Sequence, residues 1–256
     1  MGRILVTGSS TGLGLAAALE LLDAGHDVVF HARNRERARS LPSTAPVVIG
    51  DLGEPDQVHE VAIATGSHEP LDAVIHNAGI DGTAQRTVNS RGQPLVLAVN
   101  LYAPYVLTTL LGPVPRIVYL SSDMHADGRA NLDDVDWTTR PWNGTQAYCD
   151  SKLYITTLAF AVAHRWPDVR SNAVDPGWVP TRMGSPSASD DLTLGHRTQV
   201  WLATSDDPEA DTSGRYWYHQ QPTPAAPAAS DRTFQQVVLE QLERITGAAL
   251  TWRGRH

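Results

Sequence analysis

Tyr148 and Lys152 stand four residues apart in a stretch whose apolar residues recur at helical spacing, so their side chains share one helix face. A free phenol has a pKa of about 10, which is too high for ready proton exchange near neutral pH. An adjacent ammonium group stabilises the phenolate, so a tyrosine beside a lysine can act as a general acid or general base. Such pairs also occur incidentally on helix surfaces, and the surrounding residues must decide between the two interpretations.

A glycine-rich turn at residues 7–14, Thr-Gly-Ser-Ser-Thr-Gly-Leu-Gly, follows the first apolar run of the chain. Glycines at such a bend let the backbone approach a pyrophosphate, and the free amides at the start of the next helix face the anion. An ordinary strand-to-helix turn is the alternative interpretation. The position directly after a first strand favours dinucleotide binding.

Short β-branched apolar runs alternate with amphipathic stretches along the chain, and this pattern is typical of repeated β-α-β units. The runs expected to form strands are residues 3–7, 27–31, 47–50, 73–76, 116–120, 169–174 and 215–218. The stretches expected to form helices are residues 13–22, 57–64, 95–110, 146–165, 198–203 and 234–245. Because strands that are apolar throughout are covered on both faces, we expect an α/β fold with a doubly wound parallel sheet of about seven strands.

No internal repeat or shift in composition divides the chain, so we expect residues 1–256 to form a single domain. Two polar segments interrupt the alternation of expected strands and helices. They are an insertion at residues 123–144 and a loop rich in serine, proline and glycine at residues 180–195. A short Pro/Ala linker at residues 222–227 precedes a last helix at residues 230–246. Long loops in a compact domain are usually functional, and we expect the second one to close over a substrate.

The composition excludes several classes of protein. Hydrophobic residues make up 41% and charged residues 19%, which is typical of folded globular chains, and the net charge of −8 argues against general nucleic-acid binding. One cysteine, Cys149, and ten histidines without a His-x-x-x-His pair indicate neither a disulfide framework nor a metal site. The longest uncharged stretch contains several prolines, so no membrane span is expected. With apolar residues starting at Ile4 there is no room for a signal peptide, and we expect a cytoplasmic protein.

The spacing Gly8-x-x-x-Gly12-x-Gly14 resembles the short-chain dehydrogenase/reductase family. The resemblance extends from about residue 3 to residue 218 and implies a Rossmann fold that binds NAD or NADP. The other motifs that carry it are Asp51-Leu52, Asn77-Ala78-Gly79, Asn100, Ser121-Ser122, the Tyr-x-x-x-Lys motif of Tyr148 and Lys152, and the segment Asp175-Pro176-Gly177-Trp178-Val179-Pro180-Thr181.

This resemblance implies a catalytic set of Asn100, Ser122, Tyr148 and Lys152. Tyr148 would exchange the proton, and Lys152 would also hydrogen-bond the nicotinamide ribose. Asn100, which we expect to open a helix, would hold a water that relays the proton, and Ser122 would position the substrate oxygen. The residues expected to bind the dinucleotide are Gly8, Ser10, Thr11, Gly12, Leu13, Gly14, Arg33, Asp51, Leu52, Asn77, Ala78, Gly79, Tyr148, Lys152, Pro176, Gly177, Val179 and Thr181.

The end of the second expected strand bears on the choice of cofactor. Ala32 stands where NAD-binding relatives place an acid, and Arg33 follows with a guanidinium suited to a 2′-phosphate. We therefore expect NADP, with NAD as the less favoured alternative. The arginines farther along, Arg37 and Arg39, are expected to lie on a solvated helix face.

The separation of 26 positions between Ser122 and Tyr148 is about twice that typical of the family. Relatives resembling retinol dehydrogenases and protochlorophyllide reductases carry a similar insertion and a similar Ser-Ser-x-x-His sequence, which here ends at His125. The chain therefore resembles that branch of the family. The resemblance does not transfer a retinoid or chlorophyll substrate.

An apolar substrate pocket is expected beyond the carboxyl ends of the strands. The residues expected to line it are Met124, Trp178 and Met183. Trp137 and Trp142 either join this pocket or only pack the insertion. Acids at Asp190 and Asp191 disfavour a strongly anionic substrate.

The leading hypothesis is an NADP-dependent oxidoreductase that moves a hydride between nicotinamide and a carbonyl or alcohol of a hydrophobic small molecule. A dinucleotide-sensing protein without turnover is one alternative, although a sensor has no need of all four catalytic residues. A sugar-nucleotide epimerase or dehydratase is less favoured, because little chain follows Thr181 for a substrate domain.

Relatives usually associate through the helix that starts at Asn100 and the helix that carries Tyr148. Only 16 positions separate Asn100 from Arg116, and a Gly-Pro-Val-Pro turn at residues 112–115 shortens the first helix by roughly one and a half turns. We therefore expect a monomer or dimer rather than a tetramer.

Overall fold

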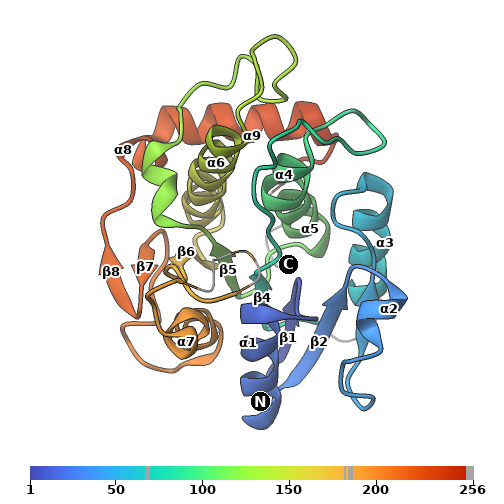
Figure 1. Ribbon diagram of the computed structural model, residues 1–256. Helices are drawn as coiled ribbons and strands as arrows, with labels where there is room; N and C mark the ends of the chain where they lie inside the picture. Colours follow the sequence, from blue (N-terminus) through green and yellow to red (C-terminus); the bar gives the residue numbers. More distant parts are fainter. Residues whose placement is uncertain (67–69, 182, 184–186, 252–256) are drawn as a thin grey trace.

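One mixed sheet forms the centre of the protein (Figure 1). A computed structural model describes residues 1–66, 70–181, 183 and 187–251. In this part of the chain the strand order is β3-β2-β1-β4-β5-β6-β7-β8, with all neighbours parallel except β7 and β8. The strands are β1 (Arg3–Val6), β2 (Asp27–Ala32), β3 (Val47–Ile49), β4 (Ala73–His76), β5 (Arg116–Leu120), β6 (Arg170–Asp175), β7 (Tyr216–Tyr218) and β8 (Gln221–Thr223).

Helices cover both faces of this sheet, which confirms the predicted doubly wound α/β fold. Figure 1 shows α1 and α7 below the sheet and α3, α5 and α6 above it, with α9 lying across the upper layer. The helices are α1 (Gly12–Asp23), α2 (Arg35–Ala38), α3 (Pro55–Gly66), α4 (Leu95–Leu97), the π-helical turn η1 (Ala98–Tyr102), α5 (Ala103–Leu111), the 3₁₀ helix η2 (Asp123–Asp127), α6 (Gly144–Arg165), α7 (Leu192–Thr204), α8 (Pro227–Ser230) and α9 (Arg232–Thr246).

The two faces of the sheet have separate hydrophobic cores. Along β1, Ile4 and Val6 pack with α1 and α7, whereas Leu5 packs with α3, α5 and α6 on the opposite face. All three side chains are 0–1% exposed. Burial on both sides explains why this strand is apolar at successive positions instead of alternating with polar residues.

The structure differs from the sequence prediction at several element boundaries. The expected linker at 222–227 contributes an additional short strand, β8, which pairs antiparallel with β7. The loop expected at 180–195 ends earlier, because Asp191 accepts hydrogen bonds from the Thr193 and Leu194 amides and starts α7 at Leu192. Residues 182 and 184–186 of this loop lie outside the described residues. The expected last helix at 230–246 is divided at Asp231, which caps α9 in the same way.

The helix expected at residues 95–110 begins at Leu95 in the structure, so the further expectation that Asn100 opens this helix is wrong. Asn100 lies instead in the π-helical turn η1 between α4 and α5. Single π-helical turns widen a helix locally and are frequent at functional sites. The wider turn carries Asn100 while the rest of the helix remains packed on the sheet.

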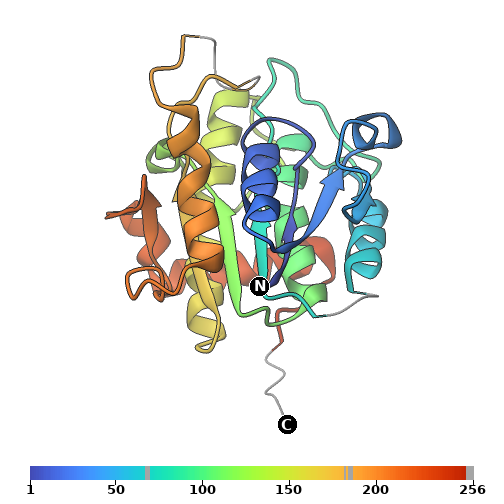
Figure 2. The same ribbon diagram turned by 90° about the horizontal axis from the view of Figure 1, so that it is seen from below.

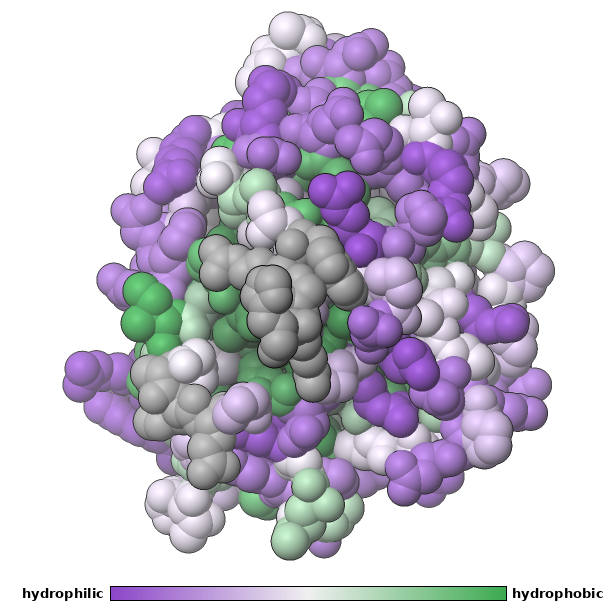
Figure 3. All heavy atoms as spheres, turned by 180° about the vertical axis from the view of Figure 1, so that it is seen from behind, coloured by the Kyte–Doolittle hydropathy of each residue, from purple (hydrophilic) through white to green (hydrophobic). Residues whose placement is uncertain are grey.

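The carboxyl ends of the parallel strands share one edge of the sheet, which is the upper edge in Figure 2. The chain turns back between β1 and β4, the neighbours at which the strand order reverses. Ligands of doubly wound sheets bind at this kind of switch point. Figure 3 shows the molecule from behind, where hydrophilic residues predominate and apolar ones appear only in patches.

Candidate functional site

The glycine turn after β1 is packed tightly against the turn after β4. Gly8 has a φ of +65°, and a Cβ atom there would lie 2.8 Å from the Ala78 Cα. A Cβ on Gly14 would collide with the side-chain amide of Asn77, which donates to the Thr7 carbonyl at 3.0 Å. These two glycines are therefore required for the close approach of the two turns.

The start of α1 offers free backbone amides. Thr11 is the N-cap residue, and its side chain makes no capping hydrogen bond. A Cβ on Gly12 would lie 4.0 Å from the Thr181 side chain, so the segment after β6 passes beside this turn. The uncapped helix end and the glycine backbone fit a pyrophosphate, as the sequence predicts.

His31 holds the glycine turn in place, a role that was not predicted from the sequence. Its Nδ1 accepts from the Gly8 amide at 2.9 Å, and its Nε2 lies 2.9 Å from the Gly50 carbonyl. The ring is 3% exposed, and burial lowers the pKa of His31. The neutral ring therefore links the ends of β1, β2 and β3. Its signal in the sequence was a histidine at the end of an otherwise apolar strand.

The predicted adenosine-side residues follow β2 and β3. Ala32 is fully buried, whereas Arg33 is exposed at the edge of the sheet. The Asp51 carboxylate accepts from the Gly53 amide at 2.9 Å and so shapes its own turn. Leu52 beside it is 4% exposed. An exposed guanidinium next to a small buried residue leaves space and charge for a phosphate.

Lys152 reaches from α6 to the end of β5. Its Nζ donates to the Leu120 carbonyl at 2.9 Å and lies 5.5 Å from the centroid of the Tyr148 ring. The side chain is only 5% exposed, and this burial lowers the pKa of Lys152 to about 8, while the charges of Asp175 and Asp81 act in the opposite direction. The ammonium group is thus a buried charge facing the predicted proton donor.

Asn100 joins the turn after β4 to α6. Its Oδ1 accepts from the Ile80 amide at 2.8 Å, and its Nδ2 donates to the Ile80 carbonyl at 3.0 Å and to the Ser151 hydroxyl at 3.1 Å. A Cβ on Gly79 would lie 3.5 Å from Asn100 Oδ1 and 3.7 Å from Lys152 Nζ. Gly79 therefore leaves open the space between these two side chains.

Ser122 and Tyr148 face each other across the end of β5. Burial raises the pKa of the Tyr148 phenol, and a hydrogen bond with Ser122 acts in the opposite direction. The Ser122 hydroxyl also donates to the Asp123 carboxylate at 3.0 Å. All four predicted catalytic residues are thus brought together, on α6, on η1 and at the end of β5.

Three carboxylates surround the Tyr148 phenol, and none of them belongs to the predicted catalytic set. The charges of Asp81, Asp175 and Asp123 all raise the pKa of Tyr148. Asp81 follows the Asn-Ala-Gly turn after β4, so its position at a strand end was the available signal. Burial in turn raises the pKa values of Asp81 and Asp175.

The predicted substrate residues lie near the same edge. Trp178 is 53% exposed and Met183 is 42% exposed, and a Cβ on Gly79 would lie 4.0 Å from Met183 Cε. Met124 follows Ser122 in η2 and is partly buried. Large apolar side chains left in solvent at the edge of a site are suited to contact an apolar ligand.

The acids at Asp190 and Asp191 have structural partners. Asp190 accepts from the Trp178 amide at 2.8 Å and from the Tyr218 hydroxyl at 3.3 Å, and Asp191 caps α7. Their carboxylates therefore hold the segment after β6 to the sheet edge and to α7. The acids whose charges act on Tyr148 are the three named above, and these carboxylates, rather than Asp190 and Asp191, would repel an anionic substrate.

Trp137 and Trp142 pack the insertion. Their rings meet edge to face at 5.3 Å, and the Arg140 guanidinium lies 3.5 Å from the centroid of the Trp137 ring. Trp137 is 4% exposed and belongs to the core above the sheet. The Trp142 indole donates to the Thr83 carbonyl at 2.8 Å. These contacts favour the packing interpretation of both residues.

Asp150, inside the Tyr-x-x-x-Lys motif, anchors the insertion to α6. Its fully buried carboxylate accepts from the Arg129 amide at 2.9 Å, the Gln146 amide side chain at 2.9 Å and the Arg140 guanidinium at 3.1 Å. The insertion therefore folds back onto the helix that carries the catalytic pair.

Asp150→Ala is expected to lower the free energy of unfolding by about 3 kcal/mol, because it removes the fully buried acceptor of three hydrogen bonds and leaves the partly buried Arg140 charge with Asp134, at 3.9 Å, as its remaining carboxylate among the described residues. Urea unfolding followed by circular dichroism measures the change. Asp211→Ala is the matched control, since the Arg170–Asp211 pair is largely exposed and should contribute much less to stability. Equal losses in the two variants would contradict an anchoring role.

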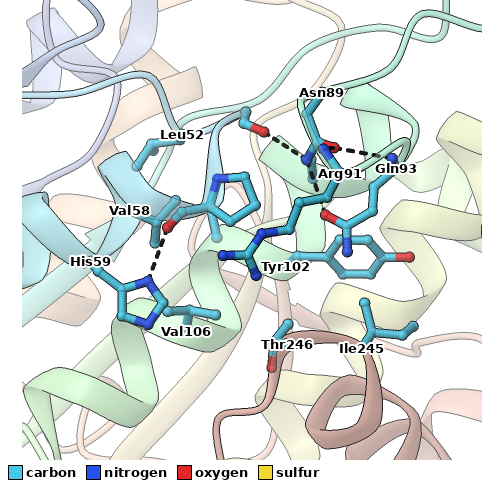
Figure 4. A pocket seen from close by; sticks show the side chains of 14 residues that line it. Leu52, Val58, His59, Asn89, Arg91, Gln93, Tyr102, Val106, Ile245 and Thr246 are labelled. Atoms are coloured by element: carbon cyan, nitrogen blue, oxygen red, sulfur yellow. Dashed lines mark hydrogen bonds between the residues drawn. The ribbon is translucent and has the colours of Figure 1, made fainter.

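A separate cavity lies between α3, the helix from Leu95 and the end of α9 (Figure 4). It measures about 350 Å³ including space open to solvent. Its lining residues are Leu52, Gly53, Pro55, Val58, His59, Asn89, Arg91, Gln93, Ala98, Tyr102, Ala103, Val106, Ile245 and Thr246. Of the predicted site residues only Leu52 contacts it, and none of the catalytic set does. The cavity is therefore distinct from the candidate catalytic site.

The fold and the site define a dinucleotide-binding α/β protein with a tyrosine–lysine pair at the carboxyl edge of its sheet. The sequence profile of the family described as short chain dehydrogenase matches residues 3–192. The chain belongs to the short-chain dehydrogenase/reductase family of oxidoreductases, whose members bind a nicotinamide dinucleotide and act on small molecules.

Three known proteins show how close this similarity is. The short-chain dehydrogenase chyC of Penicillium rubens is 35% identical, over 98% of this chain and 99% of that protein. Human retinol dehydrogenase 13 is 28% identical, over 95% of this chain and 84% of its own length, in agreement with the predicted branch. A structure of a short chain dehydrogenase from Shigella flexneri, complexed with NADP, has a TM-score of 0.68 at 24% identity, covering 86% of this chain and 97% of that one.

No helix in the described ranges has both the length and the apolar composition needed to cross a membrane.

Proposed function

We propose that the protein is an NADP-dependent carbonyl reductase or alcohol dehydrogenase acting on a hydrophobic small molecule. The observation that carries the proposal is the convergence of Tyr148, Lys152, Ser122 and Asn100 beside the glycine turn. A protein that only sensed the dinucleotide would have no need of a proton donor, a buried ammonium and a hydroxyl at one place.

Each residue of this set has a distinct task in the proposed reaction. The bound nicotinamide supplies or takes up the hydride. Tyr148 donates the proton from its Oη to the substrate oxygen in reduction and accepts it in oxidation. The Ser122 hydroxyl turns from Asp123 to hold the same oxygen, and the Lys152 ammonium favours the phenolate after the proton has left.

Asn100 supports this arrangement through the backbone. Its two bonds to Ile80 and one to Ser151 fix the turn after β4 against α6, at the point where a proton leaves the site toward solvent in our proposal. The remaining predicted cofactor residues follow β1, β2, β3, β4 and β6 at the carboxyl edge of the sheet. We propose that they bind the dinucleotide as the sequence predicts.

Arg33→Ala is expected to weaken NADPH binding by about 10- to 100-fold and to leave NADH binding unchanged. The substitution removes one charge-assisted contact with the 2′-phosphate, worth about 1.5–3 kcal/mol. Fluorescence titration with each dinucleotide measures both affinities. Arg39→Ala is the control, because this exposed arginine lies on the same side of the molecule but one helix farther along. Loss of affinity for both dinucleotides would contradict phosphate recognition by Arg33.

An uncharged or cationic substrate fits this site better than an anionic one. Asp81, Asp123 and Asp175 act together on the Tyr148 phenol, whereas Lys152 is the cation facing it. The exposed side chains of Trp178 and Met183 can make apolar contacts with a substrate beside these acids. A screen of hydrophobic ketones and aldehydes for NADPH oxidation tests the proposal. Cofactor binding without turnover over a broad panel would favour the sensing alternative.

We also propose that residues 1–256 act as one dinucleotide-binding domain and that the protein is a monomer or dimer. The helix α9 supports the second part, since it packs across α6 and its continuation reaches α5. The Phe234 ring lies 6.1 Å from Tyr154, and the Tyr105 hydroxyl donates to the Ala248 carbonyl at 2.7 Å. These contacts occupy part of the surface of both helices through which relatives associate. A cytoplasmic location stays a prediction.

Sedimentation equilibrium is expected to give a mass near 27.7 kDa, or twice this value, at micromolar concentration. The apolar face of α9, with Val238 and Leu242 1–2% exposed, occupies surface that a tetramer of the family type would need. A tetramer that persists on dilution would contradict this part of the proposal.

A further inference from the structure

His125 has both ring nitrogens engaged, each with a different part of the chain. Its Nδ1 lies 2.8 Å from the carbonyl oxygen of Ser122, and its Nε2 lies 2.9 Å from the amide nitrogen of Ala226. The side chain is 3% exposed, and its ring packs on Tyr216 at a centroid distance of 4.4 Å. The histidine therefore connects two segments that are 101 positions apart.

The two partners decide which nitrogen carries the proton. A backbone amide can only donate, so Nε2 accepts from Ala226 and is unprotonated. A carbonyl oxygen can only accept, so Nδ1 carries the proton and donates to Ser122. The same carbonyl also accepts from the His125 amide at 3.0 Å. Ser122 is thus fixed by two hydrogen bonds from one residue.

Fixing the Ser122 backbone matters because its hydroxyl must be placed accurately. In this structure the hydroxyl donates to Asp123 and accepts from the Met124 amide at 3.3 Å. Turning toward a substrate oxygen then requires only a rotation about χ1, provided that the backbone stays in place. Misplacement of a reacting group by about 1 Å can cost about 100-fold in rate.

The other partner of His125 belongs to a segment beyond the part of the chain that the family profile matches. Ala226 caps α8, and its neighbours Ala225 and Ala228 pack on the core above the sheet. Both α8 and η2 pack on α6. The hydrogen bond from the Ala226 amide to His125 ties this segment directly to η2.

We propose that His125 is a positioning residue whose ring, protonated at Nδ1, fixes Ser122 and ties it to the C-terminal segment at Ala226. The proposal rests on the function proposed above for its kinetic consequences, but the protonation of the ring does not depend on that function. His125 touches no reacting atom and acts through Ser122.

The first test is the tautomer of His125 in the ligand-free wild-type protein. Nitrogen-15 NMR of the imidazole groups, assigned with His125→Asn, is expected to show a neutral ring with the proton on Nδ1. A proton on Nε2 would overturn the proposal, since Nε2 could not then accept from Ala226. This measurement gives an answer even if no substrate is ever turned over.

Two substitutions then separate the two hydrogen bonds. Asparagine places its Nδ2 near the position of the histidine Nδ1 and can still donate to Ser122, whereas glutamine reaches the position of Nε2 and can accept from Ala226. We expect His125→Gln to lower kcat by about 10-fold or more and His125→Asn to keep kcat within about 3-fold while raising the substrate KM. NADPH affinity should stay unchanged in both.

Equal kcat values in the two variants, or a parallel loss of NADPH affinity, would indicate a merely structural residue and would overturn the proposal. His164→Asn and His164→Gln are the matched controls, because His164 is exposed near the far end of α6. If the wild type binds NADPH but reduces nothing, the proposed function fails, and the tautomer alone decides the placement of His125.

Discussion

Tyr148→Phe is expected to lower kcat for carbonyl reduction by about 10³-fold while NADPH affinity changes by less than about 3-fold. The substitution removes only the Oη that donates the proton and keeps the ring between Ser122 and Lys152. The phenol is protonated in the ligand-free site, because burial and the nearby carboxylates raise its pKa. Steady-state oxidation of NADPH with a ketone found in the screen measures kcat, and fluorescence titration measures the affinity.

Tyr105→Phe provides the matched control for this experiment. It removes the same oxygen from a tyrosine whose hydroxyl donates to the Ala248 carbonyl, in the core above the sheet. We expect this variant to lose some stability and to keep its kcat. A wild-type kcat in Tyr148→Phe would exclude Tyr148 as the proton donor. One of the acids around it would then be the candidate donor.

Charged and polar groups around Tyr148 control whether its phenol keeps its proton. Asp81, Asp123 and Asp175 all oppose loss of its proton, and the hydrogen bond with Ser122 compensates in part. A phenol held protonated in this way suits proton donation to a carbonyl. Return of the phenolate to the phenol is favoured for the same reason. The carboxylates therefore bias the ligand-free protein toward the acid form that reduction needs.

Where a local motif determines the geometry, the arrangement of residues could be predicted from the sequence. Gly8 and Gly14 are required by close backbone contacts with the next strand turn, and the four-residue spacing of Tyr148 and Lys152 places both on one face of α6. The doubly wound parallel sheet followed from the alternation of strands and helices, because a crossover between parallel strands needs a long connection that is usually a helix. These features can be recognised from short motifs, even though the glycines make their close contacts with the turn after β4.

Features that depend on distant partners were missed. The bonds of His125 to Ala226 and of His31 to Gly8 and Gly50 connect turns that meet only after the sheet has formed. A single sequence does not indicate which backbone groups a buried histidine will hydrogen-bond in the folded protein. The anchoring role of Asp150 was also not predicted, because two of its three donors come from the insertion and one comes from its own helix.

Lys152→Arg is expected to lower kcat by about 100-fold, although it keeps the positive charge. The ammonium of Lys152 fits a buried site between the Leu120 carbonyl and Gly79, and a planar guanidinium there would overpack it at a cost of about 1–3 kcal/mol. The chain uses arginine at all its other basic positions, so an arginine that sufficed here would match the rest of the composition. Steady-state kinetics measure the loss, with Arg165→Lys, an exposed position on the same helix, as the control.

The pH dependence of dinucleotide binding distinguishes the contribution of the Lys152 charge from the contribution of the side chain's shape. Because burial lowers the pKa of Lys152 to about 8, the ligand-free wild type loses this charge as the pH rises through that value. If the dinucleotide prefers the charged form, wild-type affinity should fall between about pH 7 and about pH 9. A guanidinium keeps its proton over this range, so Lys152→Arg should bind more weakly at pH 7 but show no such fall. The same decline in both proteins would assign it to another group and remove the Lys152 charge from cofactor binding.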